Sequence, residues 1–351
     1  MTATFTKPRG RYLTGHGAAL LSAGILVLMG GMCALICGAY DISVPDVVRV
    51  LSFHGIPGCD GGQTSALFHT VIWEIRLPRV LMALFTGAAL SVSGAVFQSC
   101  FGNPLAEPYV LGVSSGAAFG AALSITGMVS AMSIQSLAFG FGALAVIIAW
   151  FMARVRGETP VVTLILAGII TGSVFSALTG IMKYLAVDGA LRDIVFWLMG
   201  GFYHASWPDV VRTAPVVMVV LVVIQGMARH LNVLTLGDEQ ARSLGIHPVF
   251  SKLVLVSLAT LITALSVSAV GIVAWVGLIV PHAARMVVGP DNRFLLPLSA
   301  MLGALYLLAC DTLARTLTHA EIPVGIITSI LGAPYLFFLI KTKGRTLYGD
   351  R

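Results

Sequence analysis

The side chains that could do chemistry in this sequence are its eight histidines and five cysteines. Helical zinc enzymes pair two histidines four residues apart, as in His-Glu-x-x-His, and structural zinc sites use closely spaced Cys-x-x-Cys pairs. Neither spacing occurs here, and four of the cysteines lie inside apolar stretches, as small core residues do. The sequence therefore predicts no catalytic residue and no metal site.

A source of energy is also missing from the chain. ATPases bind phosphate with a glycine-rich loop that ends in Gly-Lys-Ser/Thr, and no Gly-Lys dipeptide is present. Proton- or sodium-coupled carriers usually keep carboxylates in the middle of the membrane, whereas the acids here lie in loops and at the ends of apolar stretches. We predict that the chain is not an enzyme and binds no cofactor itself.

Long apolar stretches must position whatever site the protein has. Hydrophobic residues make up 57% of the 351 residues and charged residues only 10%, which lies outside the usage of soluble domains. About 20 apolar residues form a helix that crosses a bilayer, and ten stretches qualify: 18–40, 77–99, 109–128, 133–153, 161–185, 209–229, 251–270, 272–283, 296–318 and 322–341. The eighth is short and follows Gly271, so the seventh and eighth should form either one bent pair or a long helix with a broken partner. The predicted fold class is an all-α polytopic membrane protein with about ten transmembrane helices.

Positive charges predict the orientation of these helices. With the N-terminus in the cytoplasm, 14 of the 21 Lys and Arg residues fall on the inner side, as the positive-inside rule requires. They are dispersed through short loops, so no nucleic-acid-binding patch is expected. The chain then divides into a cytoplasmic segment (1–17), a transmembrane domain (18–341) whose long cytoplasmic loop covers about 231–250, and a cytoplasmic tail (342–351). We expect a multi-pass protein of the bacterial inner membrane.

Arginines lie at the outer ends of two stretches. Arg76-Leu77-Pro78-Arg79 opens the second stretch; proline suits the first turn of a helix, but two cations there oppose the helix dipole. Either an acidic partner compensates them or they extend to lipid phosphates. Arg315 follows Asp311 by four residues, so the two share one helix face.

Two other segments mark the cytoplasmic side. Asn-Pro and Glu-Pro within 103–108 force a turn before a helix rich in Gly and Ser. In the long cytoplasmic loop, Asp238 and Glu239 suit the start of a helix, Arg242 suits its end, and Gly245 suits its stop. A short amphipathic helix is therefore predicted at the membrane face.

A short repeat connects the second and seventh stretches. Ala-Leu-Ser-Val-Ser occurs at 89–93 and again at 264–268, on helices predicted to run in opposite directions. Transporters are often built from inverted repeats, and this repeat favours the same architecture here.

Four motifs occur in the order that one transporter family shows: Arg-Leu-Pro-Arg at 76–79, Asn-Pro-Leu-Ala-Glu-Pro at 103–108, Leu-Gly-x-x-x-Ala-x-x-Leu-Gly at 236–245 and Pro-x-Gly-x-x-Thr-x-x-Leu-Gly-Ala-Pro at 323–334. From about Arg76 to Ile340 the chain closely resembles the permeases of ATP-binding cassette (ABC) importers for iron-siderophores, haem and cobalamin, the type II class. The resemblance implies ten helices per subunit and a homodimer. It also implies two cytoplasmic subunits that bind ATP and Mg, and a periplasmic or lipid-anchored substrate-binding protein.

The resemblance also implies residue roles. Arg76, Arg79 and Arg315 would be outer cations that receive acidic residues of the binding protein, and Asn103 and Leu105 would form the cytoplasmic gate. The fifth helix would line the pathway with Thr171, Ser173, Ser176 and Thr179. Coupling to the ATPase would involve Leu236, Gly237, Asp238, Glu239, Ala241, Arg242, Leu244 and Gly245.

The cargo expected from the resemblance is a bulky metal chelate moving from periplasm to cytoplasm. A ferric siderophore ranks first, haem second and cobalamin third, because Val161 and Val162 stand where cobalamin members are expected to carry small hydroxyl residues. The alternative is a self-sufficient secondary transporter or channel, for which a polytopic composition would be enough.

Overall fold

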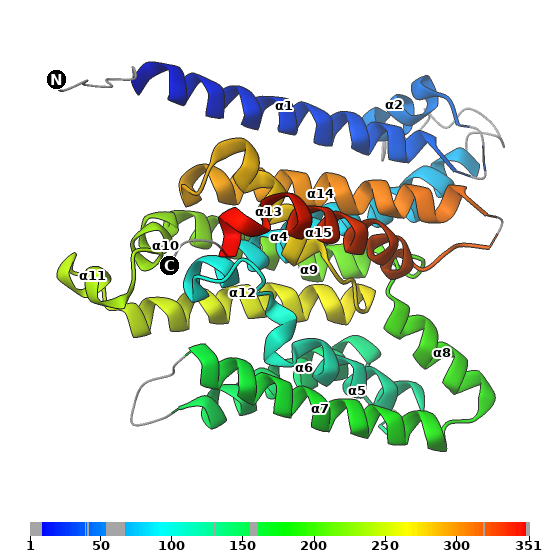
Figure 1. Ribbon diagram of the computed structural model, residues 1–351. Helices are drawn as coiled ribbons and strands as arrows, with labels where there is room; N and C mark the ends of the chain where they lie inside the picture. The colour runs from blue at the N-terminus through cyan, green and yellow to red at the C-terminus, as the bar shows by residue number, and fades with distance from the viewer. Residues whose placement is uncertain are drawn as a thin grey trace.

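The protein is a bundle of helices (Figure 1) in a computed structural model that describes residues 9–38, 40, 42–53, 67–129, 131–154, 161–318 and 320–348. Their order is α1 (Arg9–Ile36), α2 (Val44–Phe53), the π-helix η1 (Thr70–Arg76), α4 (Leu77–Phe101), the 3-10 helix η2 (Pro108–Leu111), α5 (Val113–Ile125), α6 (Ile134–Ala153), α7 (Val161–Leu185), α8 (Asp188–Met199), α9 (Trp207–Gly226), α10 (Ala228–Leu234), α11 (Asp238–Ser243), α12 (Pro248–Val270), α13 (Val276–Val288), α14 (Asn292–Thr316) and α15 (Val324–Tyr348).

Ten of these helices correspond to the ten predicted stretches. Within the described residues, seven helices are long and apolar enough to cross a membrane, and α5, α13 and α15 contribute shorter apolar helices. The all-α prediction is confirmed. The short α2, α8, α10 and α11 connect the longer helices, and α10 and α11 lie at the end of the bundle where α1 begins (Figure 1).

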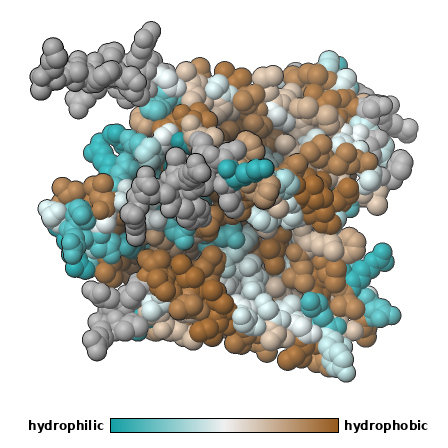
Figure 2. Space-filling view, viewed as in Figure 1, coloured by the Kyte–Doolittle hydropathy of each residue, from teal (hydrophilic) through white to brown (hydrophobic). Residues whose placement is uncertain are grey.

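The surface is apolar around the middle of the bundle and polar at its two ends. Figure 2 shows brown surface over the sides, with teal gathered near α10 and α11 and near α8. Leu28, Phe151, Val222 and Phe337, on four different helices, each keep at least 69% of their surface exposed. Such a band matches a bilayer, in which apolar side chains lose nothing by remaining exposed.

The helix α4 forms the centre of the bundle. In its most apolar window 83% of the residues are buried, and it packs against α9, α12, α13 and α14. A Cβ at Gly94 would overlap the carbonyl oxygen of Gly277 on α13, so the two backbones touch directly. Small residues permit this close approach in membrane helices. On the opposite edge of the bundle from α1, α5, α6 and α7 pack against one another.

The two halves of the chain repeat one arrangement. In each half a long helix, α4 or α12, ends at a glycine with positive φ, Gly102 at 59° and Gly271 at 76°. An irregular segment and a helix of 13 residues follow, α5 in the first half and α13 in the second. The short eighth stretch is thus one member of a matched pair, as an inverted repeat requires.

The α-helix α4 begins at Leu77 with Pro78 in its first turn, as predicted. It does not open the helical chain, however, which runs without interruption over Leu67–Phe101. Pro78 lacks the N–H that would bond to the carbonyl of Glu74, and a π-helical turn precedes it, in which Leu77 N donates to Ile72 O. The two arginines therefore lie well inside the helix, away from the positive end of its dipole.

Candidate functional site

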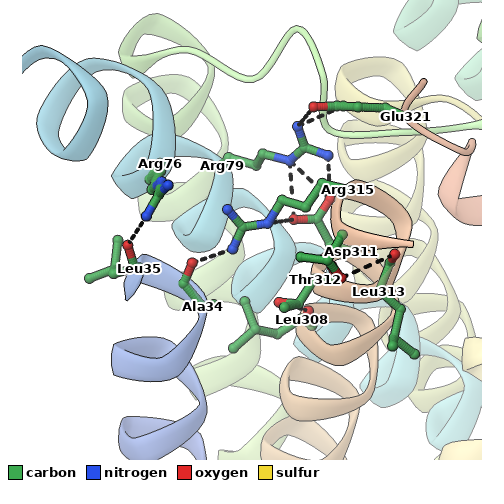
Figure 3. A network of polar contacts seen from close by, with 11 residues as sticks. Ala34, Leu35, Arg76, Arg79, Leu308, Asp311, Thr312, Leu313, Arg315 and Glu321 are labelled. Carbon is green, nitrogen blue, oxygen red and sulfur yellow. Dashed lines mark hydrogen bonds and ion pairs between the residues drawn. The ribbon is translucent and has the colours of Figure 1, made fainter. Parts of the chain in front are cut away.

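At the end of the bundle opposite α11, Arg79 of α4 is held by two carboxylates. Its Nε donates to Asp311 Oδ1 and Oδ2 at 3.0 and 3.1 Å, and its Nη2 donates to Oδ1 at 2.9 Å. Its Nη1 donates to the two Glu321 oxygens at 3.0 and 2.8 Å. Figure 3 shows the guanidinium lying between the two acids, one from α14 and one from the loop before α15. Bidentate arginine–carboxylate bonds of this kind are strong and directional.

The two acids differ in exposure. The Asp311 side chain is 0% exposed and that of Arg79 is 9% exposed, whereas the Glu321 side chain is 44% exposed. Asp311 is therefore a permanent partner of Arg79, and Glu321 is a partner that water or another charged group can reach.

Arg76 and Arg315 bind the C-terminal end of α1. Arg76 Nη1 donates to the carbonyls of residues 35 and 36 at 2.7 and 2.8 Å, and its Nη2 donates to Tyr40 O at 2.8 Å. Arg315 Nη2 donates to the carbonyl of residue 34 (Figure 3), and its Nε lies 3.9 Å from Asp311 Oδ2. The last carbonyls of a helix have no partner within it and carry the negative end of its dipole. Both arginines therefore cap α1.

The expectation of an acidic partner is confirmed for Arg79, whereas Arg76 is bound by backbone carbonyls. Arg315 and Asp311 come together as their i,i+4 spacing predicts. Arg76 and Arg79 are only 4% and 7% exposed, so the three arginines are occupied within the chain. Their docking role stays a prediction.

The predicted helix in the cytoplasmic loop forms with the expected bounds, as α11 (Asp238–Ser243). Asp238 and Glu239 occupy its first turn and Arg242 its last, and Gly245 follows with φ at 80°. Asp238 accepts from Lys252 Nζ at 2.6 Å, which ties α11 to α12.

The residues around α11 divide into a buried anchor and an exposed rim. Ala241 is fully buried, whereas Leu236 and Leu244 are 58% and 61% exposed. The backbone of Gly237 precedes the helix at φ 107°. Two exposed leucines beside a short charged helix form a surface suited to a protein partner.

The predicted gate residues lie in the turn after α4. Asn103 Oδ1 accepts from Leu105 N at 2.9 Å, an Asx-turn that fixes the reversal. Leu105 is 41% exposed. Burial raises the pKa of the neighbouring Glu107 to about 7, so this turn carries a carboxyl group that is partly protonated near neutral pH.

The four predicted lining residues of α7 separate into two pairs. Ser173 and Ser176 are exposed, and Ser176 Oγ bonds to Ser115 Oγ at 3.3 Å. Thr171 and Thr179 are 3% and 4% exposed. The first pair lies where a path along α7 can reach it, and the second faces the interior of the bundle.

Several polar contacts join residues far apart in the chain, and the sequence alone does not predict them. These are the contacts of Asp311 and Glu321 with Arg79 and that of Gln98, which accepts from Arg285 Nη1 at 3.1 Å. A usable signal existed: a cation in an apolar stretch needs a partner, and the acids at the outer ends of other stretches were the candidates. Within the described ranges, no three His, Cys, Asp or Glu side chains come close enough to share a metal ion.

The comparisons with known proteins agree with this arrangement. The model of the FecCD transport family matches residues 25–342. The cobalamin import system permease of Halobacterium salinarum is 42% identical over 276 residues, 78% of this chain and 74% of that protein. A probable iron chelatin permease of Helicobacter pylori is 39% identical over 275 residues, 78% and 83% of the two chains.

A solved structure extends the agreement to the fold. An inward-facing metal-chelate type ABC transporter superposes with a TM-score of 0.82 at 32% identity, covering 92% of this chain and 98% of that one. The family model and these relatives each cover well over half of the sequence. The chain therefore belongs to the FecCD transport family, the permeases of ABC importers for metal chelates.

Proposed function

We propose that this permease carries a ferric siderophore from the periplasm to the cytoplasm across a bacterial inner membrane, working as a homodimer. Permeases of this family are transport components whose ATPase is a separate subunit. The proposal adds two ATP-binding subunits that hold ATP and Mg on the cytoplasmic side, and a periplasmic or lipid-anchored binding protein on the other. Family membership does not favour the alternative of a self-sufficient carrier or channel.

The exposed rim of α11 supports the ATPase partner. Leu236 and Leu244 are more than half exposed, and a helix of six residues is too short to be stable by itself. No side chain caps its N-terminus and its one buried residue is Ala241, so a groove on the ATPase would complete its packing. A downward or tilting motion of the ATPase would then reach the transmembrane helices through α12, to which Asp238 is tied.

The exposed face of α7 supports the dimer and the pathway. It combines Ser173 and Ser176 with exposed apolar residues such as Ile170 and Val174. A second copy packed along this face would cover the apolar residues and leave the two serines at a common axis. Weak hydroxyl contacts suit a pathway, because tight binding there would slow release.

We also propose that the binding protein docks at the outer arginines, chiefly at Arg79. Arg79 is the best placed of the three, since its half-exposed partner Glu321 can give way to a carboxylate of the binding protein. Charge reversal of Arg76, Arg79 or Arg315 should unfold the permease, because the side chains of all three have internal partners and little exposure. Glu321→Gln is the sharper test: docking should strengthen at low salt and the gain should shrink at high salt, with unchanged docking counting against the role.

The substrate is tested by uptake in a strain that lacks the endogenous importer. Radiolabelled ferric siderophore, haem and cobalamin are compared, and molybdate is added because one relative, at 34% identity, is named for it. Uptake of the ferric siderophore alone supports the proposal, and uptake of another compound in its place contradicts it. Purified permease should hydrolyse no ATP until the ATPase subunit is added; hydrolysis by the permease alone would contradict the separate-subunit arrangement.

A further inference from the structure

An apolar groove of about 270 Å³ opens between α4, α9 and α14. Val92, Leu221, Leu296, Ala300 and Met301 contribute to its walls, and Gln225 is its polar residue. Val222, on its rim, is 71% exposed. The groove is therefore a furrow on the apolar side of the bundle.

A proline shapes the floor of the groove. Pro297 lies inside α14 and lines the furrow, and it has no N–H to donate to the carbonyl four residues earlier, that of Arg293. Gln225 Nε2 donates to this carbonyl at 3.0 Å. The amide of α9 thus replaces the missing bond of α14 and makes the end of the groove beside Arg293 polar.

The polar end of the groove, its mouth, carries an excess of positive charge. Asn232 of α10 accepts from the Asn292 backbone N–H at 2.8 Å and donates to Asp291 Oδ1 at 2.7 Å, which fixes α10 beside the start of α14. Arg229 is exposed and lies three residues before Asn232, on the same side of α10. Arg293, whose side chain is 54% exposed, bonds to Asp291 at 2.6 Å. Two cations and one anion leave a net positive charge at the mouth.

The distance from the charged end to the far side of the groove suits one half of a bilayer. Arg293, outside the groove, and Met301, which lines it, are eight residue steps apart on α14, about 12 Å along the helix axis, and one leaflet of hydrocarbon is about 15 Å deep. The charged end lies on the side of α10 and α11, which faces the cytoplasm in the proposed orientation. A lipid headgroup at Arg229 and Arg293 would place its acyl chain along the groove.

We propose that this groove is a binding site for an anionic phospholipid of the inner leaflet. The acyl chain fills the furrow beside Pro297, and the phosphate group is held by Arg229 and Arg293. Neutral phospholipid lacks the net charge that the mouth selects. The assignment to the inner leaflet rests on the orientation given under the proposed function. Lipid binding can be measured without transport, so failure of the lipid site can be distinguished from failure of the proposed function.

The test is native mass spectrometry of the full-length purified permease with phosphatidylglycerol or phosphatidylcholine added at equal concentration. The permease should retain phosphatidylglycerol in preference, and Arg229→Gln with Arg293→Gln should reduce that preference by about fivefold for each cation lost. Arg212→Gln, at the other end of α9, is the matched charge control and should leave the preference unchanged. Equal retention of the two lipids, or an unchanged preference in the double variant, would overturn the anionic site.

Two single substitutions to tryptophan on α9 test whether the groove holds the acyl chain. Val222→Trp fills the rim of the groove, whereas Val219→Trp changes a residue of the same helix that is 64% exposed and does not line it. Both positions are exposed, so both variants should fold with the thermal stability of the parent in detergent. Loss of lipid retention in the first alone supports the proposal, and equal behaviour of the two variants contradicts it.

Discussion

Removal of the charge on Asp311 should be among the most damaging single changes in this protein. Asp311→Asn keeps the size of the side chain and removes the one fully buried acid of the outer cluster. Arg79, whose side chain is 9% exposed, would then keep only Glu321, and Arg315, 7% exposed, would have no carboxylate partner. The cluster would go from three cations and two anions to three cations and one anion.

The structure gives the size of the effect. Breaking a buried ion pair by removing one partner costs about 3 to 5 kcal/mol of unfolding free energy, because a desolvated charge is left behind. Glu321→Gln removes a carboxylate from the same guanidinium, but its side chain is 44% exposed and water can replace it. Exposed pairs contribute about 0.2 to 1 kcal/mol. The buried change should therefore cost at least threefold more than the exposed one.

The two variants can be compared by reversible unfolding in mixed detergent and SDS micelles, followed by tryptophan fluorescence. Glu321→Gln is the internal control, since it alters the same arginine. A loss below about 1 kcal/mol for Asp311→Asn, or equal losses in the two variants, would show that the outer cluster is solvated and would refute the reasoning from burial.

Three further outcomes are expected. Gly94→Ala should prevent stable folding because its Cβ would overlap the Gly277 carbonyl, whereas Gly24→Ala, with nothing within 4 Å of its Cβ, should be tolerated; equal melting temperatures would contradict the close contact. Since burial raises the pKa of Glu107 from 4.5 to about 7, the folded state retains a proton between those pH values that the unfolded chain releases, and stability should fall as pH rises through this window. Glu107→Gln should flatten that slope, and an unchanged pH profile would count against the assigned pKa. Leu244→Glu should leave the melting temperature unchanged but abolish ATP-driven uptake; normal uptake would show that the α11 rim contacts nothing.

Local sequence chemistry predicted some parts of the structure residue by residue. The helix α11 has the expected bounds, because acids at its start, Arg242 at its end and Gly245 after it each act within one turn. The ten apolar stretches likewise became ten helices, since the length of an apolar run alone decides whether it can cross a bilayer.

Local sequence patterns could not predict contacts between segments that are far apart in the chain. Arg79 and Asp311 are separated by 232 positions, and no local pattern says which of several outer acids an arginine will meet. The π-helical segment before α4 was not predicted for a related reason: Pro78 fits the first turn of α4 by its own preference, but the preceding residues extend the helical chain through a π-turn that tolerates the missing N–H. The burial of Arg76 and Arg315 follows from the position of α1, which packing determines.

The backbone contact between Gly94 and Gly277 has a mechanical consequence. Helices that already touch at their main chains cannot be squeezed closer, and an offset along the axis would bring side chains into the space that the glycines leave open. The helices α4 and α13 therefore move together as one rigid unit of the subunit. Any rocking of the permease has to bend the chain elsewhere, and the irregular segments after Gly102 and Gly271 can bend because they lack a continuous series of helical hydrogen bonds. A crosslink between α4 and α13 should leave transport intact, whereas a crosslink that fixes the segment after Gly102 or after Gly271 should stop transport.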